Sequence, residues 1–379
     1  MGKLNTIRDA GAGGIDHREL NEALEKGCAK WEELYGLRYI RFSDDYKHIP
    51  RGTAVFNNIT VWGYPHIGRI LILQSGITEQ FSDPFWVEEK VDGYNVRVFR
   101  LGDRILALTR GGFICPFTTD RIPDLLDIAL FESLPEIVVC GEMAGPDNPY
   151  LSGGTPVIDE DVALLVFDFM RINKTGFLAQ HDKMLYIDTY NLPSVNIFGR
   201  YDKEALPEIR NIILQLNEEG REGVIFKDDS AANRRAKYVT GRSDISDISL
   251  TAQNLLELPP EYFTNRILRL TLFLKEHGLD TNTTLVSKQL GSALLNGLLE
   301  AIYQYQMEHK VYHTHRCRFL EHSNAILLVD QLRHIQRQTQ IVQRDLHREG
   351  KYWVLEFDKI YLTMSGLLGH LLSGGLVFD

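Results

Sequence analysis

Lys90 stands in the setting that a covalent nucleophile requires. It begins the string Lys-Val-Asp-Gly, in which Asp92 places a carboxylate nearby and Gly93 allows a tight turn that a ligand can approach closely. The string lies between two apolar-rich runs, and the alternation after Gly93 is typical of a strand. An amine must be neutral to attack, so the lysine pKa has to fall from about 10.4 toward neutrality. Without further support, the same string also fits a solvated hairpin turn.

Five further sites follow Lys90 along the chain, each on or beside a strand-like run. They are Thr109 with Arg110, Glu142, Phe167, Glu222 with Lys227, and Arg235 with Lys237. Carboxylates, bases and a flat aromatic ring are suited to ribose, phosphate and base recognition. Taken singly, each also has a plain structural reading as a surface carboxylate, a core phenylalanine or a solvated charge run. Their order and spacing relative to Lys90 therefore carry the functional interpretation.

In this order the motifs resemble those of the covalent nucleotidyltransferase superfamily, which comprises ATP-dependent RNA ligases, DNA ligases and mRNA capping enzymes. The resemblance covers about residues 85–240, and the Gly93-Tyr-Asn95 continuation is closest to RNA ligases. The chain as a whole resembles the homodimeric archaeal-type ATP-dependent RNA ligases. One motif departs from the family pattern, because Arg235-Ala-Lys237 stands where Lys-x-Lys is common.

The resemblance implies an ATP-dependent RNA ligase that joins 5′-phosphate and 3′-hydroxyl RNA ends through a lysyl-AMP and an RNA-adenylate. The implied catalytic residues are Lys90, Glu222, Lys227 and Lys237, with Glu222 also binding Mg²⁺ or Mn²⁺. The implied ATP-binding residues are Lys90, Thr109, Arg110, Glu142, Phe167, Ile225, Lys227 and Lys237, and the implied RNA contacts are Asn95, Arg110 and Arg235. Glu222 and Lys227 are expected to act in the chemistry rather than in folding.

The fold class that this resemblance implies is α+β, a nucleotidyltransferase (ATP-grasp-like DNA/RNA ligase) fold of antiparallel sheets with a helical C-terminal half. We expect an N-terminal accessory module at 1–64, a nucleotidyltransferase domain at 65–245, a helical dimerisation domain at 246–310 and a C-terminal domain at 311–379. The N-terminal module contains a helix-like run from His17 to Leu34. Apolar residues at three- and four-residue steps predict helices over Tyr262 to His277 and Ser287 to Met307.

These two C-terminal helices carry more apolar surface than an accessory domain needs to bury. The residues concerned are Leu268, Leu272, Leu290, Leu294, Leu298 and Ile302. We expect a second copy of the chain to cover them in a twofold contact, which makes the protein a homodimer. The alternative is that residues 311–379 fold back over the helices within one chain.

Composition is that of an ordinary globular protein, with 379 residues, 44% of them hydrophobic and 24% charged. The net charge of −10 argues against indiscriminate coating of nucleic acid, whereas residues 221–242 hold six basic side chains against three acidic ones. The sequence shows no membrane-spanning run and no signal-peptide pattern. Four widely separated cysteines without a Cys-x-x-Cys pair indicate reduced thiols, so we expect a cytoplasmic protein.

A histidine-rich segment lies between His309 and His322. His313, His315 and Cys317 would project from one face of a strand as a zinc half-site, but a fourth ligand is lacking. A surface that contacts RNA or another subunit is the favoured interpretation.

Two rival functions use related features. A DNA ligase or a GTP-using capping enzyme would employ the same lysine, but both normally continue into an OB-fold, and the helical pattern after residue 245 argues against one. A non-catalytic RNA-end-binding protein of the same fold would have no need of intact Lys90, Glu222 and Lys237.

Overall fold

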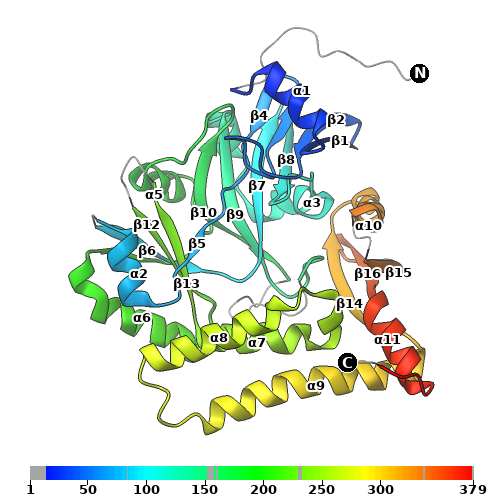
Figure 1. The fold of residues 1–379 in the computed structure, drawn as a ribbon. Coiled ribbons are helices and arrows are strands. Elements are labelled where there is room, and N and C mark those ends of the chain that lie inside the picture. Colours follow the sequence, from blue (N-terminus) through cyan, green and yellow to red (C-terminus); the bar gives the residue numbers. More distant parts are fainter. Residues whose placement is uncertain are drawn as a thin grey trace. The chain divides into compact units, whose positions relative to one another are not determined.

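The computed structural model describes residues 14–82, 84–151, 158, 161–228, 233–335 and 338–377 (Figure 1). The chain divides into two compact units, each assembled from three separate segments. The first unit consists of residues 1–66, 94–143 and 164–194, and the second of residues 67–93, 144–163 and 195–379.

The first unit is built on two four-stranded sheets, in the orders β1-β2-β3-β4 and β10-β9-β7-β8. Its elements are α1 (His17–Glu25), β1 (Ala29–Leu34), β2 (Leu37–Phe42), β3 (Ala54–Phe56), β4 (Ile59–Val61), β7 (Tyr94–Leu101), β8 (Arg104–Thr109), α3 (Pro116–Leu125), α4 (Ala129–Ser133), β9 (Ile137–Ala144), β10 (Ala163–Arg171) and α5 (Gln180–Thr189). The predicted helix from His17 to Leu34 is wrong in its second half. The helix ends at Glu25, Gly27 takes a φ of +74°, and the chain returns as strand β1.

The second unit holds a five-stranded sheet in the order β11-β6-β12-β13-β5 and a three-stranded sheet in the order β14-β16-β15. Its strands are β5 (Gly68–Arg69), β6 (Phe85–Lys90), β11 (Ile197–Tyr201), β12 (Gly223–Asp228), β13 (Arg235–Val239), β14 (Tyr312–Phe319), β15 (Thr339–Glu349) and β16 (Tyr352–Tyr361). Its helices are α2 (Leu73–Gln80), the short η1 (Lys203–Ala205), α6 (Leu206–Glu218), α7 (Gly241–Thr251), the short η2 (Ala252–Glu257), α8 (Glu261–Glu276), α9 (Thr284–Glu308), α10 (His322–Ile335) and α11 (Leu362–Leu372). Only the β13–β5 pair in the larger sheet is parallel.

One face of the five-stranded sheet is apolar and forms the core of this unit. Alternate residues of the central strands, such as Val87, Phe226 and Tyr238, are buried together with residues of α2 and α6, including Ile77 and Ile213. Because side chains alternate between the faces of a strand, the intervening residues must lie on the opposite face. That second face carries Lys90 and most of the basic residues that the sequence singles out.

Helices α8 and α9 confirm the two predicted C-terminal helices to within three residues at each end. The apolar surface of α9 is used differently from the prediction. Leu298 and Ile302 pack against a cluster that includes Val311 and Tyr361, so the C-terminal segment does fold back over this side of the helix. These two residues are therefore covered in part within one chain, and their contact with a partner subunit stays a prediction.

A different stripe of α9 stays exposed. Leu295, Leu299, Tyr303 and Met307 follow one another at four-residue steps and are each 60–66% exposed. Residues at this spacing share one face of a helix, so they form a continuous apolar row.

None of the helices in the described residues is both long enough and apolar enough to cross a bilayer.

The predicted α+β class with antiparallel sheets and a helix-rich C-terminal half is confirmed. The three-stranded sheet of β14, β15 and β16 adds a feature that the sequence patterns did not reveal. Strand β15 is polar and buries only one of its eleven residues, so it lacks the alternating apolar pattern from which strands are recognised.

Candidate active site

The polar face of the five-stranded sheet brings together the three lysines predicted to contact ATP and Arg235, which is predicted to contact RNA. The register aligns three rows across β6, β12 and β13: Lys90–Gly223–Val239, Glu88–Ile225–Lys237 and Trp86–Lys227–Arg235. Side chains directly opposite each other on one face have Cβ atoms about 4.5–5.5 Å apart. Lys90 therefore shares one small surface with Lys227, Arg235 and Lys237, which lie more than a hundred positions further along the chain.

Lys90 is the last residue of β6 and forms an ion pair with Glu222. Its Nζ lies 2.5 Å from Glu222 Oε2, and the two side chains are 20% and 15% exposed. Glu222 directly precedes β12, and the next residue, Gly223, is the cross-strand partner of Lys90. A Cβ on Gly223 would lie 2.1 Å from the Tyr238 carbonyl oxygen, so only glycine lets β13 approach here. The Glu-Gly dipeptide thus aims a carboxylate at the lysine.

Lys227 is not left free for a phosphate, because it is paired with Glu88. Its Nζ lies 2.6 Å from Glu88 Oε2, and the side chains are 5% and 1% exposed. Glu88 stands two residues before Lys90 on the same face, and the sequence analysis missed it. A buried carboxylate without a cation is costly, so Lys227 contributes to folding as well as to the charge of this surface.

Asp92 follows Lys90 in the turn, and its ionisation is strongly affected by its neighbours. The pKa of the Asp92 carboxyl is raised to about 6, first by desolvation and then by the negative charges of Glu222 and Asp247, although part of the residue still reaches solvent. Lys90 and Arg266 oppose this shift. Charges from β6, from the residue before β12, and from α7 and α8 therefore converge around the turn that follows the nucleophile.

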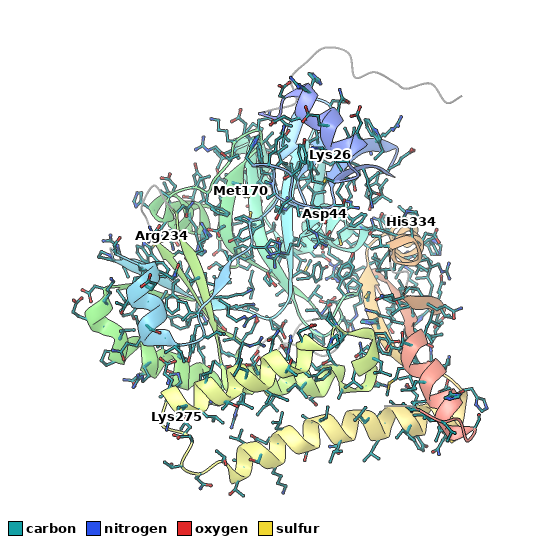
Figure 2. All side chains as sticks on the ribbon, viewed as in Figure 1. Lys26, Asp44, Met170, Arg234, Lys275 and His334 are labelled. Carbon is teal, nitrogen blue, oxygen red and sulfur yellow. The ribbon has the colours of Figure 1, made fainter. Side chains whose placement is uncertain are left out.

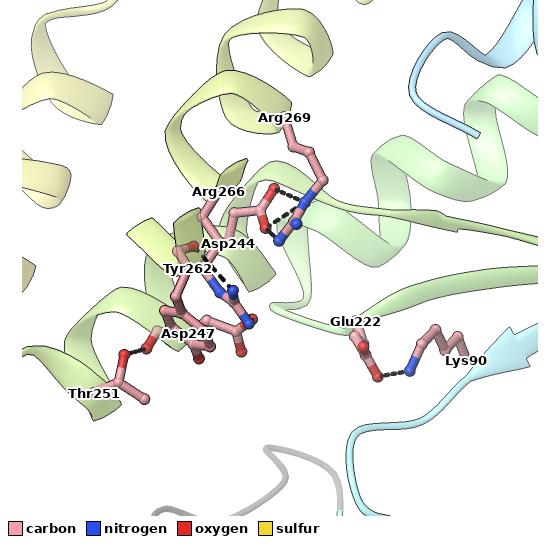
Figure 3. A network of polar contacts seen from close by, with 8 residues as sticks. All are labelled: Lys90, Glu222, Asp244, Asp247, Thr251, Tyr262, Arg266 and Arg269. Atoms are coloured by element: carbon pink, nitrogen blue, oxygen red, sulfur yellow. Dashed lines mark hydrogen bonds and ion pairs between the residues drawn. The ribbon is translucent and has the colours of Figure 1, made fainter. Parts of the chain in front are cut away.

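Helices α7 and α8 contribute a polar network to this region (Figure 3). Arg266 of α8 pairs with Asp247 of α7, and one turn further along Arg269 pairs with Asp244. None of these four residues belongs to the motifs found in the sequence. The two residues of each ion pair lie about twenty positions apart in the chain. Neither helix carries a residue pattern that predicts the network.

The first unit holds the remaining predicted contacts. Asn95 of β7 lies directly opposite Glu142 of β9, which places the two polar groups on one face of the sheet. Phe167 of β10 meets Tyr64 edge to face at 5.3 Å, and the Tyr64 hydroxyl donates to Asp168. The ring of Phe167 is half-buried, as expected for an aromatic surface that could still stack on a base.

Thr109 and Arg110 lie at the end of β8, where a buried arginine shapes the backbone. Arg97 is fully buried and donates to the carbonyl oxygens of Trp62, Gly52 and Thr109. Burial lowers the pKa of its guanidinium group to about 10. Arg110 is exposed, and its Nη2 lies 3.2 Å from His66 Nδ1.

The residues around Lys90 fit a divalent metal that arrives with a nucleotide. In the described part of the chain, no group of three or more histidine, cysteine or acidic side chains could hold an ion by itself. Mg²⁺ keeps several waters and commonly takes only one or two protein carboxylates beside substrate phosphates. Glu222, next to the nucleophile and partly exposed, can supply such a ligand.

The histidine-rich segment forms part of strand β14 rather than a metal site. His315 is 3% exposed and its ring stacks on Phe357 at 5.1 Å, while Nδ1 lies 3.4 Å from the Asn148 carbonyl oxygen. The pKa of His315 is lowered to about 3, first by burial and then by the nearby His313 and Lys359. No metal-holding group is found here among the described residues.

This histidine predicts a pH dependence of stability. The folded-state pKa of His315 lies below its unfolded value of about 6.5, so at lower pH only the unfolded chain binds a proton at this residue. The free energy of unfolding is therefore highest above that value and decreases as pH falls. Between pH 6.5 and 5 the loss should be about 2 kcal/mol. We expect His315→Phe to reduce this acid sensitivity in urea unfolding at the two pH values. His334→Phe, at an exposed position on α10 (Figure 2), should keep the wild-type dependence, and equal pH profiles for all three proteins would contradict the account.

Comparisons with known proteins agree with this geometry. Residues 83–239 match the family described as RNA ligase, and residues 250–375 match the C-terminal region of the ligase Pab1020. The uncharacterized protein MJ0414 of Methanocaldococcus jannaschii is 31% identical over 295 residues, which cover 75% of this chain and 74% of that one.

Two solved structures are similar over almost the whole chain. An archaeal ATP-dependent RNA ligase is 29% identical, with a TM-score of 0.88 over 96% of this chain and 97% of that one. A protein of Aquifex aeolicus named as a candidate ATP-dependent DNA ligase is 55% identical, with a TM-score of 0.92 over 95% and 99%. These matches confirm the nucleotidyltransferase fold that the motifs implied. The chain belongs to the family of archaeal-type ATP-dependent RNA ligases.

Proposed function

We propose that this protein seals RNA by joining a 5′-phosphate end to a 3′-hydroxyl end, using ATP. The observation that carries the proposal is the placement of Lys90 against Glu222 on a sheet face that also holds Lys227 and Lys237. A lysine with a carboxylate in contact and cations on the same surface can attack a phosphate and stabilise the charge that develops.

In the first step the neutral Lys90 amine attacks the α-phosphorus of ATP. A nitrogen–phosphorus bond forms, the bond from that phosphorus to the bridging oxygen breaks, and pyrophosphate leaves with the electron pair. The amine gives up one proton before the attack and one as the phosphoramidate forms, and Glu222 is the nearest acceptor at 2.5 Å. The 5′-phosphate of RNA then takes the AMP from Lys90, and a 3′-hydroxyl displaces the AMP to form the new phosphodiester.

The other predicted residues take supporting roles in this scheme. Lys237 and Lys227 are proposed to stabilise the α-phosphate, with Ile225, the cross-strand neighbour of Lys237, against the nucleotide. Glu142, Phe167, Thr109 and Arg110 of the first unit are proposed to bind ribose, adenine and phosphate. Asn95, Arg110 and Arg235 are proposed to bind RNA. Mg²⁺ or Mn²⁺ on Glu222 would supply charge neutralisation for the phosphates.

The Aquifex relative raises DNA as a second candidate substrate. The C-terminal region argues against that assignment, because DNA ligases resembling this core normally continue into an OB-fold, which has five strands. After β13, the described residues instead form five α-helices, the short helix η2 and a three-stranded sheet. A sealing assay with matched nicked strands tests the choice. Ligation of RNA 5′-phosphate ends with ATP is expected, and equal or faster ligation when both strands are DNA would contradict the proposal.

We propose that the protein acts as a homodimer in the cytoplasm. None of the four cysteines forms a disulfide within the described part of the chain, which suits a reducing compartment. The exposed apolar row of α9 is the surface proposed to meet a second copy of the chain. Four large apolar side chains that follow one another along one exposed face of a helix are better explained as an interface than as a free surface.

A charge placed in this row tests the dimer. Leu299→Asp is expected to convert the assembly to monomers, because a carboxylate in an apolar contact is strongly unfavourable. The measurement is sedimentation equilibrium at micromolar concentration, where the wild type should have twice the 43.4 kDa chain mass. Leu185→Asp, at a residue of α5 that is 52% exposed, is the matched control and should stay dimeric. A wild type that sediments as a monomer would exclude the proposed interface.

A further inference from the structure

Arg266 of α8 is held in one orientation beside the region of the nucleophile (Figure 3). Its Nε donates to Asp247 Oδ2 over 2.7 Å, and its Nη2 lies 2.7 Å from the same oxygen. Its guanidinium carbon lies 3.3 Å from the centre of the Tyr262 ring, and Nη1 donates to the Tyr262 carbonyl oxygen over 3.1 Å. The carboxylate and the ring together fix the plane of the guanidinium group.

These contacts leave part of the guanidinium group unused. An arginine carries five N–H donors, and within the described residues the contacts engage three of them. One N–H on each terminal nitrogen remains, which is the arrangement that binds two oxygens of a phosphate at once. The Arg269–Asp244 pair differs, because Asp244 is 1% exposed whereas Asp247 is 28% exposed. The Arg266 and Arg269 side chains are about equally accessible, at 16% and 14% exposed, so the pairs differ in their carboxylates, and the Arg266–Asp247 pair is the one with an open side.

The charge balance of the sheet face shows why such an arginine is needed. Lys90 is paired with Glu222 and Lys227 with Glu88, so two of its cations are already neutralised. A triphosphate is strongly anionic, and its terminal phosphates gain charge when they leave. Arg266 lies close enough to the turn after Lys90 for its charge to act on Asp92, and its charge also acts on Arg69 of β5.

We propose that Arg266 binds the β- and γ-phosphates of ATP and stabilises the departing pyrophosphate, with Asp247 and Tyr262 positioning its guanidinium group. This inference rests on the proposed function and assigns a residue of the C-terminal helices to its first step. In that step the electron pair of the broken phosphorus–oxygen bond goes to pyrophosphate, next to the arginine fork. The two later steps involve no pyrophosphate, so Arg266 is needed only for adenylylation of the protein.

The test separates the steps. Single-turnover adenylylation by ATP and its reversal by added pyrophosphate report the first step, and sealing of a pre-adenylylated RNA strand without ATP reports the last. The variants are Arg266→Gln, Arg266→Lys and the control Lys275→Gln. Lys275 lies on the same helix (Figure 2) and is 77% exposed, and it is paired with Asp280 rather than with the network.

Arg266→Gln is expected to slow adenylylation and its reversal by about a hundredfold or more, while sealing of pre-adenylylated RNA keeps the wild-type rate. Arg266→Lys should recover part of the loss, since it keeps the charge but not the fork. Wild-type adenylylation by Arg266→Gln would overturn this inference and leave the proposed function standing. Equal losses in both assays would mean a structural role and would also overturn it. A wild-type protein that takes no label from ATP would overturn the proposed function and this inference with it.

Discussion

Lys90→Ala is expected to abolish transfer of AMP from ATP to the protein, because no other lysine on this sheet face lies at the turn with a carboxylate in contact. Lys90 is partly exposed, and the Glu222 side chain that it leaves behind is 15% exposed, so water can solvate the carboxylate. The fold should therefore survive. The measurement is incubation with ATP labelled in its α-phosphate, followed by denaturing electrophoresis.

Lys275→Ala provides the control for this experiment, because it removes an exposed lysine from the same unit. It should label as the wild type does. A Lys90→Ala protein that still carries the label after denaturation would show that another residue is the nucleophile.

Lys227→Met is expected to lower the free energy of unfolding by about 3–5 kcal/mol, because it leaves the buried Glu88 carboxylate without its cation. The sequence-based expectation that Lys227 would matter little for folding does not take this partner into account. Urea unfolding followed by circular dichroism measures the loss. Glu88→Gln in the same chain removes the uncompensated charge and should restore most of the stability.

The double variant also separates the two roles of Lys227. Once stability is restored, a remaining loss of adenylylation reports the contact with phosphate, for which about a hundred- to thousandfold is expected. If Lys227→Met alone is as stable as the wild type, the ion pair contributes little to folding. If the double variant is adenylylated at the wild-type rate, Lys227 has no part in the chemistry.

The motifs around the nucleophile could be predicted from the sequence because the chemistry demands particular residues in a fixed order. Lys90, Glu222 and Lys237 come together on one sheet face although they are far apart in the chain. Strand β13 alternates between polar and apolar residues, but β6 and β12 do not, so the motifs rather than the strand patterns locate the polar face of this sheet.

The partners of these residues could not be predicted in the same way. Glu88 belongs to a strand whose neighbouring residues are mostly buried, and only the register with β12 shows that it meets Lys227. Arg266 and Asp247 lie on two helices whose mutual packing determines their contact, which no local pattern encodes. The predicted helix over His17 to Leu34 is too long, because the helix ends at Glu25, before Gly27, and the chain continues as a strand.

The central claim is that Lys90 carries AMP during catalysis, and peptide mapping by mass spectrometry tests it most directly. The wild-type protein is incubated with ATP and Mg²⁺, digested, and compared with a sample to which pyrophosphate is then added. The account predicts one AMP on the peptide that contains Lys90, and its loss when pyrophosphate reverses the step. An AMP on another residue, or no adduct with ATP, would contradict it.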